Sequence, residues 1–205
     1  KKDLIYLDSY LPLEAKRKLV REMLKVCLDL GFPVFINEKS PLVLRDLDIL
    51  KKIDERSYVN IGFSIISAID NEVKEVFEPC SPPVKARFDA MRQVSDNNIM
   101  VGTVLMPILP FISDDEENIK CVVKETKVSG GKYVLDAGLT LSGYCKTRYY
   151  QALERFDPSL IVEYNKLYND IEKLREYTAK VHRIVVKYCK NYDLHNHIPR
   201  PIEFY

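Results

Sequence analysis

The side chains that could bind a metal ion lie far apart along this chain of 205 residues. Zinc and iron–sulfur sites usually take two or three ligands from neighbouring positions, whereas the two closest of the five cysteines are Cys121 and Cys145. His195 and His197 have the spacing of a ligand pair, but a polar turn is the favoured interpretation. Scattered cysteines are typical of reduced proteins that use them as small core residues, so we expect a cytoplasmic protein.

Other residues could contact a substrate or a nucleic acid, but each has a simpler interpretation. Asp8, Asp136 and Tyr144 lie near the ends of expected strands, where polar residues are common. The tyrosines after residue 145 could stack on bases, although tyrosines more often pack helices against a sheet. The net charge of +1 argues against a general nucleic-acid-binding surface, which is usually strongly basic. No apolar run approaches the roughly 18 residues that a membrane span needs.

Hydrophobic periodicity predicts that strands and helices alternate up to about residue 143. It predicts strands at 4–10, 33–40, 58–67, 99–107 and 132–141, and helices at 12–31, 44–53, 70–79, 81–94 and 113–128. The first helix is expected to carry Leu19, Met23, Val26 and Leu30 on one face, and Ser81 is expected to cap the fourth. Apolar strands separated by helices are typical of a parallel sheet, in a barrel or a doubly wound fold.

The pattern changes after Gly143, and this change predicts two parts of the chain. Residues 146–190 have continuous helical periodicity with one break at 156–158, and 191–205 form an irregular tail. We therefore expect a β/α body over residues 1–145 and a helical extension with a tail over 146–205.

One strand is expected to end in a rigid loop. The stretch 101–119 reads VGTVLMPILPFISDDEENI, so an apolar run meets Pro107 and Pro110 before an acidic helix start. In parallel α/β folds, the loops at the carboxyl ends of strands build the active site. Two prolines hold such a loop at a low entropic cost. A stiff connecting loop without function is the simpler interpretation of this stretch alone.

Several such segments together resemble a known family. They are DSYLPLE (8–14), EKSPLVLRDLDILKKI (38–53), IGFSIIS (61–67), EPCSPPVKARFDAM (78–91) and VLMPILPFISDDEENI (104–119). The chain resembles the radical S-adenosylmethionine superfamily, in the branch of spore photoproduct lyase and the DNA repair photolyase-like proteins. The resemblance covers residues 3 to 143 in order and spacing. Phe111 stands where members of the branch usually have glycine, and DSYLP departs from their Asp-Pro-Tyr-Gln-Pro.

The resemblance implies a fold and a set of cofactor contacts. The fold would be a partial β/α barrel whose first strand and cluster loop are absent, with S-adenosylmethionine across the strand ends. Lys39 would reach the cofactor carboxylate as a point charge, and Ser64 would bind its ribose or amino-acid part. Leu105 and Met106 would line the adenine, and Ser9 is a further expected cofactor contact. Within the same motifs, Glu78 and Arg87 are expected to form a structural ion pair.

One departure from the family concerns its metal centre. Members hold a 4Fe-4S cluster with a C-x3-C-x2-C motif, and this cluster reduces the cofactor to a 5′-deoxyadenosyl radical. The motif does not occur here, and in the family it lies upstream of the position that matches Lys1. The full-length protein would be a radical enzyme with ferredoxin or flavodoxin as reductant, acting on an unknown substrate that could be a nucleic-acid lesion. As alternatives, the chain is a cluster-less barrel that binds a ligand or serves as a scaffold, or a conventional acid–base barrel enzyme.

Overall fold

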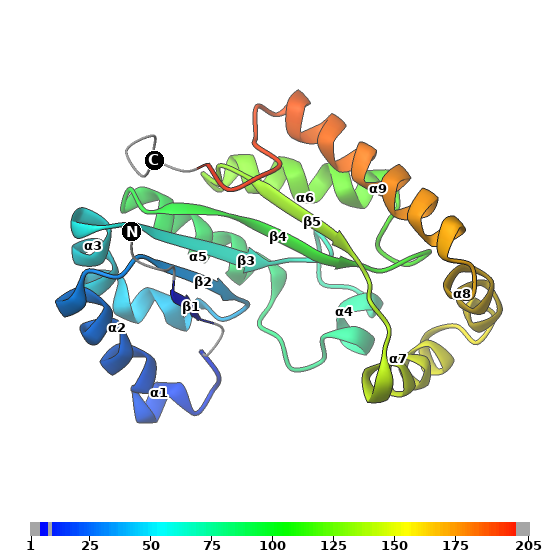
Figure 1. Cartoon of the computed structure of the whole chain (residues 1–205), viewed down its shortest axis with the longest axis horizontal. Coiled ribbons are helices and arrows are strands. Elements are labelled where there is room, and N and C mark those ends of the chain that lie inside the picture. The colour runs from blue at the N-terminus through cyan, green and yellow to red at the C-terminus, as the bar shows by residue number, and fades with distance from the viewer. Residues whose placement is uncertain (1–4, 8–9, 200–205) are drawn as a thin grey trace.

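The computed structural model describes residues 5–7 and 10–199, and these form an α/β structure around a parallel sheet (Figure 1). The strands are β1 (Ile5–Leu7), β2 (Val34–Glu38), β3 (Val59–Ser64), β4 (Met100–Ile108) and β5 (Val134–Gly138). Their order across the sheet is the order of the chain, and every neighbouring pair is parallel. The predicted α/β class with a parallel sheet is confirmed.

Helices connect the strands and follow the last one. They are α1 (Glu14–Arg17), α2 (Leu19–Leu30), the 3-10 helix η1 (Pro41–Asp46), α3 (Leu47–Arg56), α4 (Glu72–Phe77), α5 (Val84–Asp96), α6 (Glu116–Val128), α7 (Gly143–Phe156), α8 (Leu160–Tyr168) and α9 (Ile171–Asn191). Helix α7 begins just before the expected division at residue 145, and the division into two parts stays a prediction. No helix among the described residues is both long enough and apolar enough to cross a membrane.

Two expectations about the helices are wrong. One predicted helix is interrupted by a residue with a left-handed backbone, and another is capped by a residue far away in the sequence. The helix predicted over 12–31 is divided at Lys18, whose φ of 57° lies in the left-handed region. The fourth helix is not capped by Ser81. It begins at Val84, whose backbone N–H donates to both carboxylate oxygens of Asp70, at 3.1 and 3.2 Å. That cap comes from 14 residues away, beyond the reach of a local capping pattern.

One face of the sheet is covered by helices and holds the main core. Side chains alternate along a strand, and Ile61, Phe63, Val101, Leu105 and Val134 point to this face. They meet fully buried residues of the covering helices, which are Leu24 of α2, Leu50 of α3, Met91 of α5, Val123 of α6 and Val185 of α9. Because α9 shares this core, the last helix is part of the body that the strands form.

The chain returns to the sheet after α9. The backbone N–H of Val134 donates to the carbonyl of His195 at 2.9 Å, and the N–H of His195 donates to the carbonyl of Lys132 at 3.1 Å. His195 thereby forms a parallel bridge with Tyr133 on the outer side of β5. The segment expected to be an irregular tail therefore begins with a backbone contact that continues the order of the strands.

Tyr133 crosses the opposite face of the sheet, where glycines make room for it. Its buried hydroxyl donates to Oδ1 of Asn60 at 2.9 Å, and its ring lies against Gly102. A Cβ atom added to Gly102 would stand 2.5 Å from the Tyr133 carbonyl oxygen and 2.7 Å from its ring. Only glycine fits this close approach.

Replacing Gly102 with alanine should therefore lower the free energy of unfolding by about 1–3 kcal/mol, the usual cost of overpacking. A matched control is Gly138→Ala, whose new Cβ would meet only the side chain of Thr178 at 3.2 Å. Urea denaturation of both variants measures the difference. Equal stability of the parent and Gly102→Ala would contradict the close passage of Tyr133.

Candidate functional site

Lys39 and Ser64 come together at the carboxyl ends of two neighbouring strands. Lys39 directly follows β2, Ser64 ends β3, and the register pairs Glu38 with Phe63. Glu78 joins them, because its Oε1 lies 3.5 Å from Nζ of Lys39. Its Oε2 forms an ion pair with Nη1 of Arg87 at 2.8 Å, and the same Nη1 donates to the Ser64 carbonyl at 2.9 Å. Four residues from three motifs thus form one chain of contacts, called the Lys39–Ser64 site below.

Arg87 is the centre of this site and is completely buried. Besides Glu78 and Ser64, it binds the carbonyl of Pro82 through Nε at 3.1 Å and Nη2 at 3.0 Å. A guanidinium can serve several acceptors in one plane, so Arg87 ties the end of β3 to the segment between α4 and α5. The predicted ion pair between Glu78 and Arg87 is confirmed.

Lys39 differs from Arg87 because its charge stays accessible. Its side chain is 42% exposed, and its contact with Glu78 is long, at 3.5 Å. The loop that carries it is held by Glu38, whose carboxylate accepts from the backbone N–H groups of Lys39 at 3.1 Å and Ser40 at 3.2 Å. The same carboxylate accepts from the N–H of Tyr10 at 2.6 Å, which brings the loop after β1 to this place. Lys39 is thus a positioned cation that a ligand can reach.

The other expected cofactor contacts are placed less favourably. Ser64 is buried and pairs with Val104 of β4, so Leu105 and Met106 lie one and two residues farther along that strand. Leu105 is completely buried in the helix-covered core, which directs its side chain away from the face of Ser64. Met106 is half-buried and precedes Pro107 through a cis peptide bond. Ser9 lies outside the described residues.

The Pro-x-x-Pro segment begins inside β4, at Pro107, and the loop that follows the strand is held by tyrosines of the last helices. The hydroxyl of Tyr164 donates to the carbonyl of Pro110 at 2.7 Å, and the N–H of Phe111 donates to the hydroxyl of Tyr177 at 3.2 Å. Phe111 has a φ of 62°, in the left-handed region. This conformation is easiest for glycine, which accounts for the glycine expected at this position from the resemblance.

The tyrosine-rich segment packs on itself rather than presenting an open surface for bases. The rings of Tyr164 and Tyr168 stack with centroids 5.7 Å apart, and the hydroxyls of Tyr149 and Tyr164 are 2.7 Å apart. Tyr164 is completely buried, and Tyr168 donates to the carbonyl of Leu139 at 2.8 Å. These tyrosines are therefore packed, but mainly against one another and not between a helix and the sheet as expected.

The weaker substrate candidates have structural contacts or lie elsewhere. Asp136 accepts from the side-chain N–H of Asn196 at 2.9 Å, and one of its oxygens lies 3.0 Å from Nδ1 of His182 on α9. It therefore links β5 to the last helix and the segment after it. Tyr144 is 74% exposed on α7, and Asp8 lies outside the described residues.

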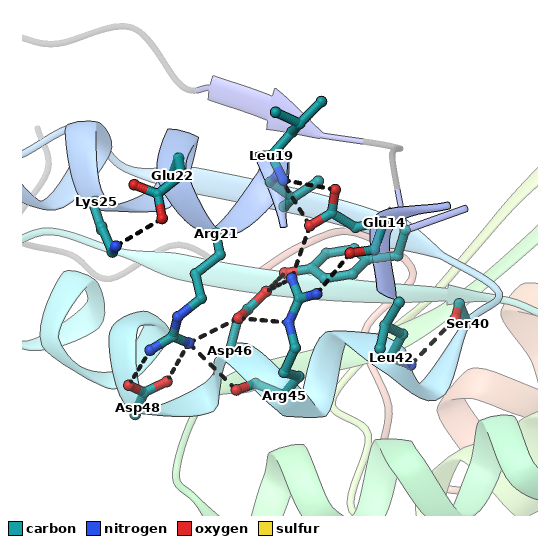
Figure 2. A network of polar contacts seen from close by, with 12 residues as sticks. Glu14, Leu19, Arg21, Glu22, Lys25, Ser40, Leu42, Arg45, Asp46 and Asp48 are labelled. Carbon is teal, nitrogen blue, oxygen red and sulfur yellow. Dashed lines mark hydrogen bonds and ion pairs between the residues drawn. The ribbon is translucent and has the colours of Figure 1, made fainter. Parts of the chain in front are cut away.

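A second polar network joins α1, α2 and η1 and was missed by the sequence reasoning (Figure 2). Its centre is the completely buried carboxylate of Asp46, which accepts from Arg21 at 2.8 Å, from Arg45 at 2.7 Å and from the hydroxyl of Tyr10 at 3.0 Å. Arg45 also binds the buried Glu14 at 2.8 Å. The signal in the sequence was a group of three charged residues, Arg45, Asp46 and Asp48, in the otherwise apolar stretch LVLRDLDIL.

The charges of this network are set by its hydrogen bonds. Burial opposes ionisation, but hydrogen bonds from the two arginines and from Tyr10 hold the pKa of Asp46 below its ordinary value. The carboxylate of Glu14 additionally accepts from the backbone N–H groups of Leu19 and Val20, at 2.9 and 3.1 Å. Glu14 therefore caps the start of α2, where negative charge is favoured. The network fixes the segment that links β1 to α2 against η1.

No group of three or more potential metal ligands occurs among the described residues. Cys27 and Cys189 are buried at separate places, and Cys80 and Cys145 are exposed. These residues do not fit the ligand set of a 4Fe-4S cluster, which uses closely grouped thiolates.

No protein-family model matches the chain. It is 34% identical to an uncharacterized protein of Methanocaldococcus jannaschii over 120 residues, which are 58% of this chain and 43% of that protein. It is 24% identical to an uncharacterized protein of Acidianus two-tailed virus over 172 residues, 80% of this chain and 55% of that protein. A similar relative, also uncharacterized, occurs in Mycobacterium bovis, with 24% identity over 161 residues. The matched part spans about half the length of these relatives.

Proposed function

We propose that this chain is the S-adenosylmethionine-binding part of a radical S-adenosylmethionine protein of the spore photoproduct lyase-like branch. The observation that carries the proposal is the Lys39–Ser64 site. Four residues that the family resemblance singles out, spread over residues 39–87, contact one another at the shared end of β2 and β3. In parallel α/β folds, ligands bind at this end of the strands.

We further propose that the sheet is a segment of a β/α barrel. Its strands follow one another in chain order without reversal, whereas a doubly wound sheet reverses its order at the ligand-binding crevice. The bridge of His195 beside β5 continues the same order. Both observations support a singly wound arrangement with its helices on one face.

The described residues fit S-adenosylmethionine better than they fit a cluster. Lys39 offers an accessible ammonium group to the cofactor carboxylate, and Glu78 holds that group in place. Met106 offers a half-buried apolar side chain beyond the end of β3. S-adenosylmethionine supplies the 5′-deoxyadenosyl group in this superfamily. The cluster and a reductant such as ferredoxin or flavodoxin would come from outside the described residues.

The experiment measures binding of S-adenosylmethionine to the protein by isothermal titration calorimetry. Lys39→Met should weaken binding about 10- to 100-fold, the value of a lost charge-assisted hydrogen bond of about 1.5–3 kcal/mol. Lys52→Met is the matched control, because Lys52 is exposed on α3, away from the strand ends. The affinity of this variant for S-adenosylmethionine should match that of the parent. Equal affinity of the two variants, or no binding to the parent, would overturn the assignment of this site.

A second candidate function is a ligand-binding or scaffold module without radical chemistry. It is favoured by the lack of a cluster-type ligand group among the described residues. Reconstitution of the natural full-length polypeptide with iron and sulfide separates the two. Formation of 5′-deoxyadenosine under reducing conditions supports the radical protein, and its absence supports the module. A nucleic-acid substrate and a cytoplasmic location stay predictions, and the net charge of +1 gives the former no support.

A further inference from the structure

A histidine and a buried aspartate meet where α9 packs beside β5 (Figure 1). The two carboxylate oxygens of Asp136 lie 3.1 and 3.0 Å from Nδ1 of His182. The Asp136 side chain is only 7% exposed and also accepts from the side-chain N–H of Asn196 at 2.9 Å. The segment after α9 thus holds the carboxylate in place, and the carboxylate in turn fixes the imidazole ring.

This contact determines which ring nitrogen of His182 carries a proton. An ionised carboxylate can only accept hydrogen bonds, so Nδ1 of His182 is the donor to Asp136. Nε2 has no hydrogen-bond partner among the described residues, and half of the His182 side chain is exposed. In the neutral ring Nε2 is therefore an acceptor with a fixed orientation. A histidine held in this way can accept a hydrogen bond or a proton from a ligand.

A groove of about 520 Å³ adjoins this histidine and runs between the end of β5 and α9. Residues 136–140 form one side of the groove, and residues of α9 between 171 and 182 form the other. Apolar side chains, Leu139 and Leu174 among them, lie between the polar members of this lining. The groove therefore offers an apolar surface beside the free nitrogen of His182.

Arg175 supplies a positive charge at the other end of the groove. It precedes His182 by seven residues of α9, so the two side chains leave the helix in nearly the same direction, about 10 Å apart along its axis. Its Nη1 donates to Glu172 at 2.8 Å, but its side chain is 70% exposed, which leaves its other N–H groups accessible. The groove thus combines a cation, an apolar middle and a hydrogen-bond acceptor.

We propose that this groove binds a small organic acid whose carboxylate pairs with Arg175 and whose far end donates a hydroxyl group to Nε2 of His182. An apolar spacer between the two end groups lies on the leucines of the lining. Asp136 is a positioning residue in this site, because His182 occupies both of its oxygens. The site is separate from the Lys39–Ser64 site, since two strands lie between β5 and β2 in the sheet. It therefore does not depend on the proposed function.

The test compares two probes on the natural full-length polypeptide by NMR titration. Para-hydroxyphenylacetate carries both end groups on a rigid apolar ring, and phenylacetate lacks only the hydroxyl. The hydroxyl probe should bind about three- to tenfold more tightly, the usual value of one added hydrogen bond. The ring signals of His182 should shift during the titration with this probe.

Two variants assign the end groups of the probe. His182→Asn keeps a side-chain N–H for Asp136 but removes Nε2, so both probes should bind it as phenylacetate binds the parent. A histidine with only a structural role would leave the preference for the hydroxyl probe unchanged. Arg175→Met should weaken both probes about two- to fivefold, the range of an exposed charge pair. Arg183→Met is the matched control, because Arg183 is exposed on the same helix but does not line the groove.

Three results would overturn the proposal. They are the lack of saturable binding of para-hydroxyphenylacetate to the parent, equal affinity of the parent for the two probes, and an unchanged preference for the hydroxyl probe in His182→Asn. The first two results need no variant, so they decide the matter even if His182→Asn does not fold.

Discussion

Replacing Asp46 with alanine is expected to lower the free energy of unfolding by about 3–5 kcal/mol, the usual cost of breaking a buried ion pair. The Asp46 carboxylate is completely buried and accepts from Arg21 at 2.8 Å and from Arg45 at 2.7 Å. Without it, two guanidinium groups would be left close together, and the hydroxyl of Tyr10 would lose its acceptor. Because Tyr10 and Glu14 hold the segment between β1 and α2, that segment should loosen first.

Asp48 provides the matched control for this prediction. It binds the same Arg21 at 2.7 Å, but its side chain is 58% exposed. Exposed ion pairs contribute about 0–1 kcal/mol, so Asp48→Ala should change stability little. Urea denaturation of both variants at pH 7 measures the difference. A similar loss in both would show that burial of Asp46 does not determine its contribution.

The contribution of Asp46 should also depend on pH, in a definite direction. Its pKa is lower in the folded protein than in the unfolded chain, because the surrounding donors favour the carboxylate. The stabilisation is therefore complete above the unfolded pKa and is lost as the pH falls through the folded one. The stability difference between the parent and Asp46→Ala should shrink as the pH is lowered from 7 to 3. A constant difference over this range would contradict the shift.

Replacing Arg87 with methionine is the second change expected to have a large effect, again of about 3–5 kcal/mol. Arg87 is completely buried and binds Glu78 at 2.8 Å, so its loss leaves a nearly buried carboxylate with only the longer contact to Lys39. It also removes the donors of the Ser64 and Pro82 carbonyls. The end of β3 should then lose its connection to the start of α5.

Two further variants separate the charge of Arg87 from its shape. Arg87→Lys keeps the charge but cannot serve several acceptors in one plane, so it should recover only part of the stability. Arg92→Met removes an exposed arginine of the same helix and should cost little. If Arg87 positions the Lys39–Ser64 site, the affinity for S-adenosylmethionine should fall with Arg87→Met under conditions where that variant remains folded. Unchanged stability of Arg87→Met would contradict the role of the buried pair.

The element order could be predicted from the sequence because each strand and helix has its own local pattern. The apolar runs around Ile36, Ile61, Val101 and Val134 became buried strands, and prolines and acidic residues marked the helix starts nearby. Helix starts set by distant groups could not be predicted in this way. The cap of α5 by Asp70 comes from 14 residues away, and the cap of α2 by Glu14, although local, depends on the break between α1 and α2 at Lys18.

Helix α2 illustrates a second limit of periodicity. The row of Leu19, Met23, Val26 and Leu30 was recognised as an apolar face, yet the sheet is contacted by the adjacent row of Val20, Leu24 and Cys27. Both rows have helical spacing, and nothing in the local sequence indicates which of the two rows packs against the sheet. That choice depends on the position of β1 and α3, which only the folded structure specifies.

The sequence by itself determined the parallel α/β class and the order of the elements, because these follow from hydrophobic periodicity, whereas the candidate residues at the ends of the strands came from the family resemblance. Tertiary structure alone decided how Lys39 and Ser64 meet the Glu78–Arg87 pair, that Leu105 turns into the core, and that Asp46 is buried between two arginines. The physical reason is that contacts between distant residues depend on strand register and helix rotation. These are set by the packing of the whole chain and not by any short segment.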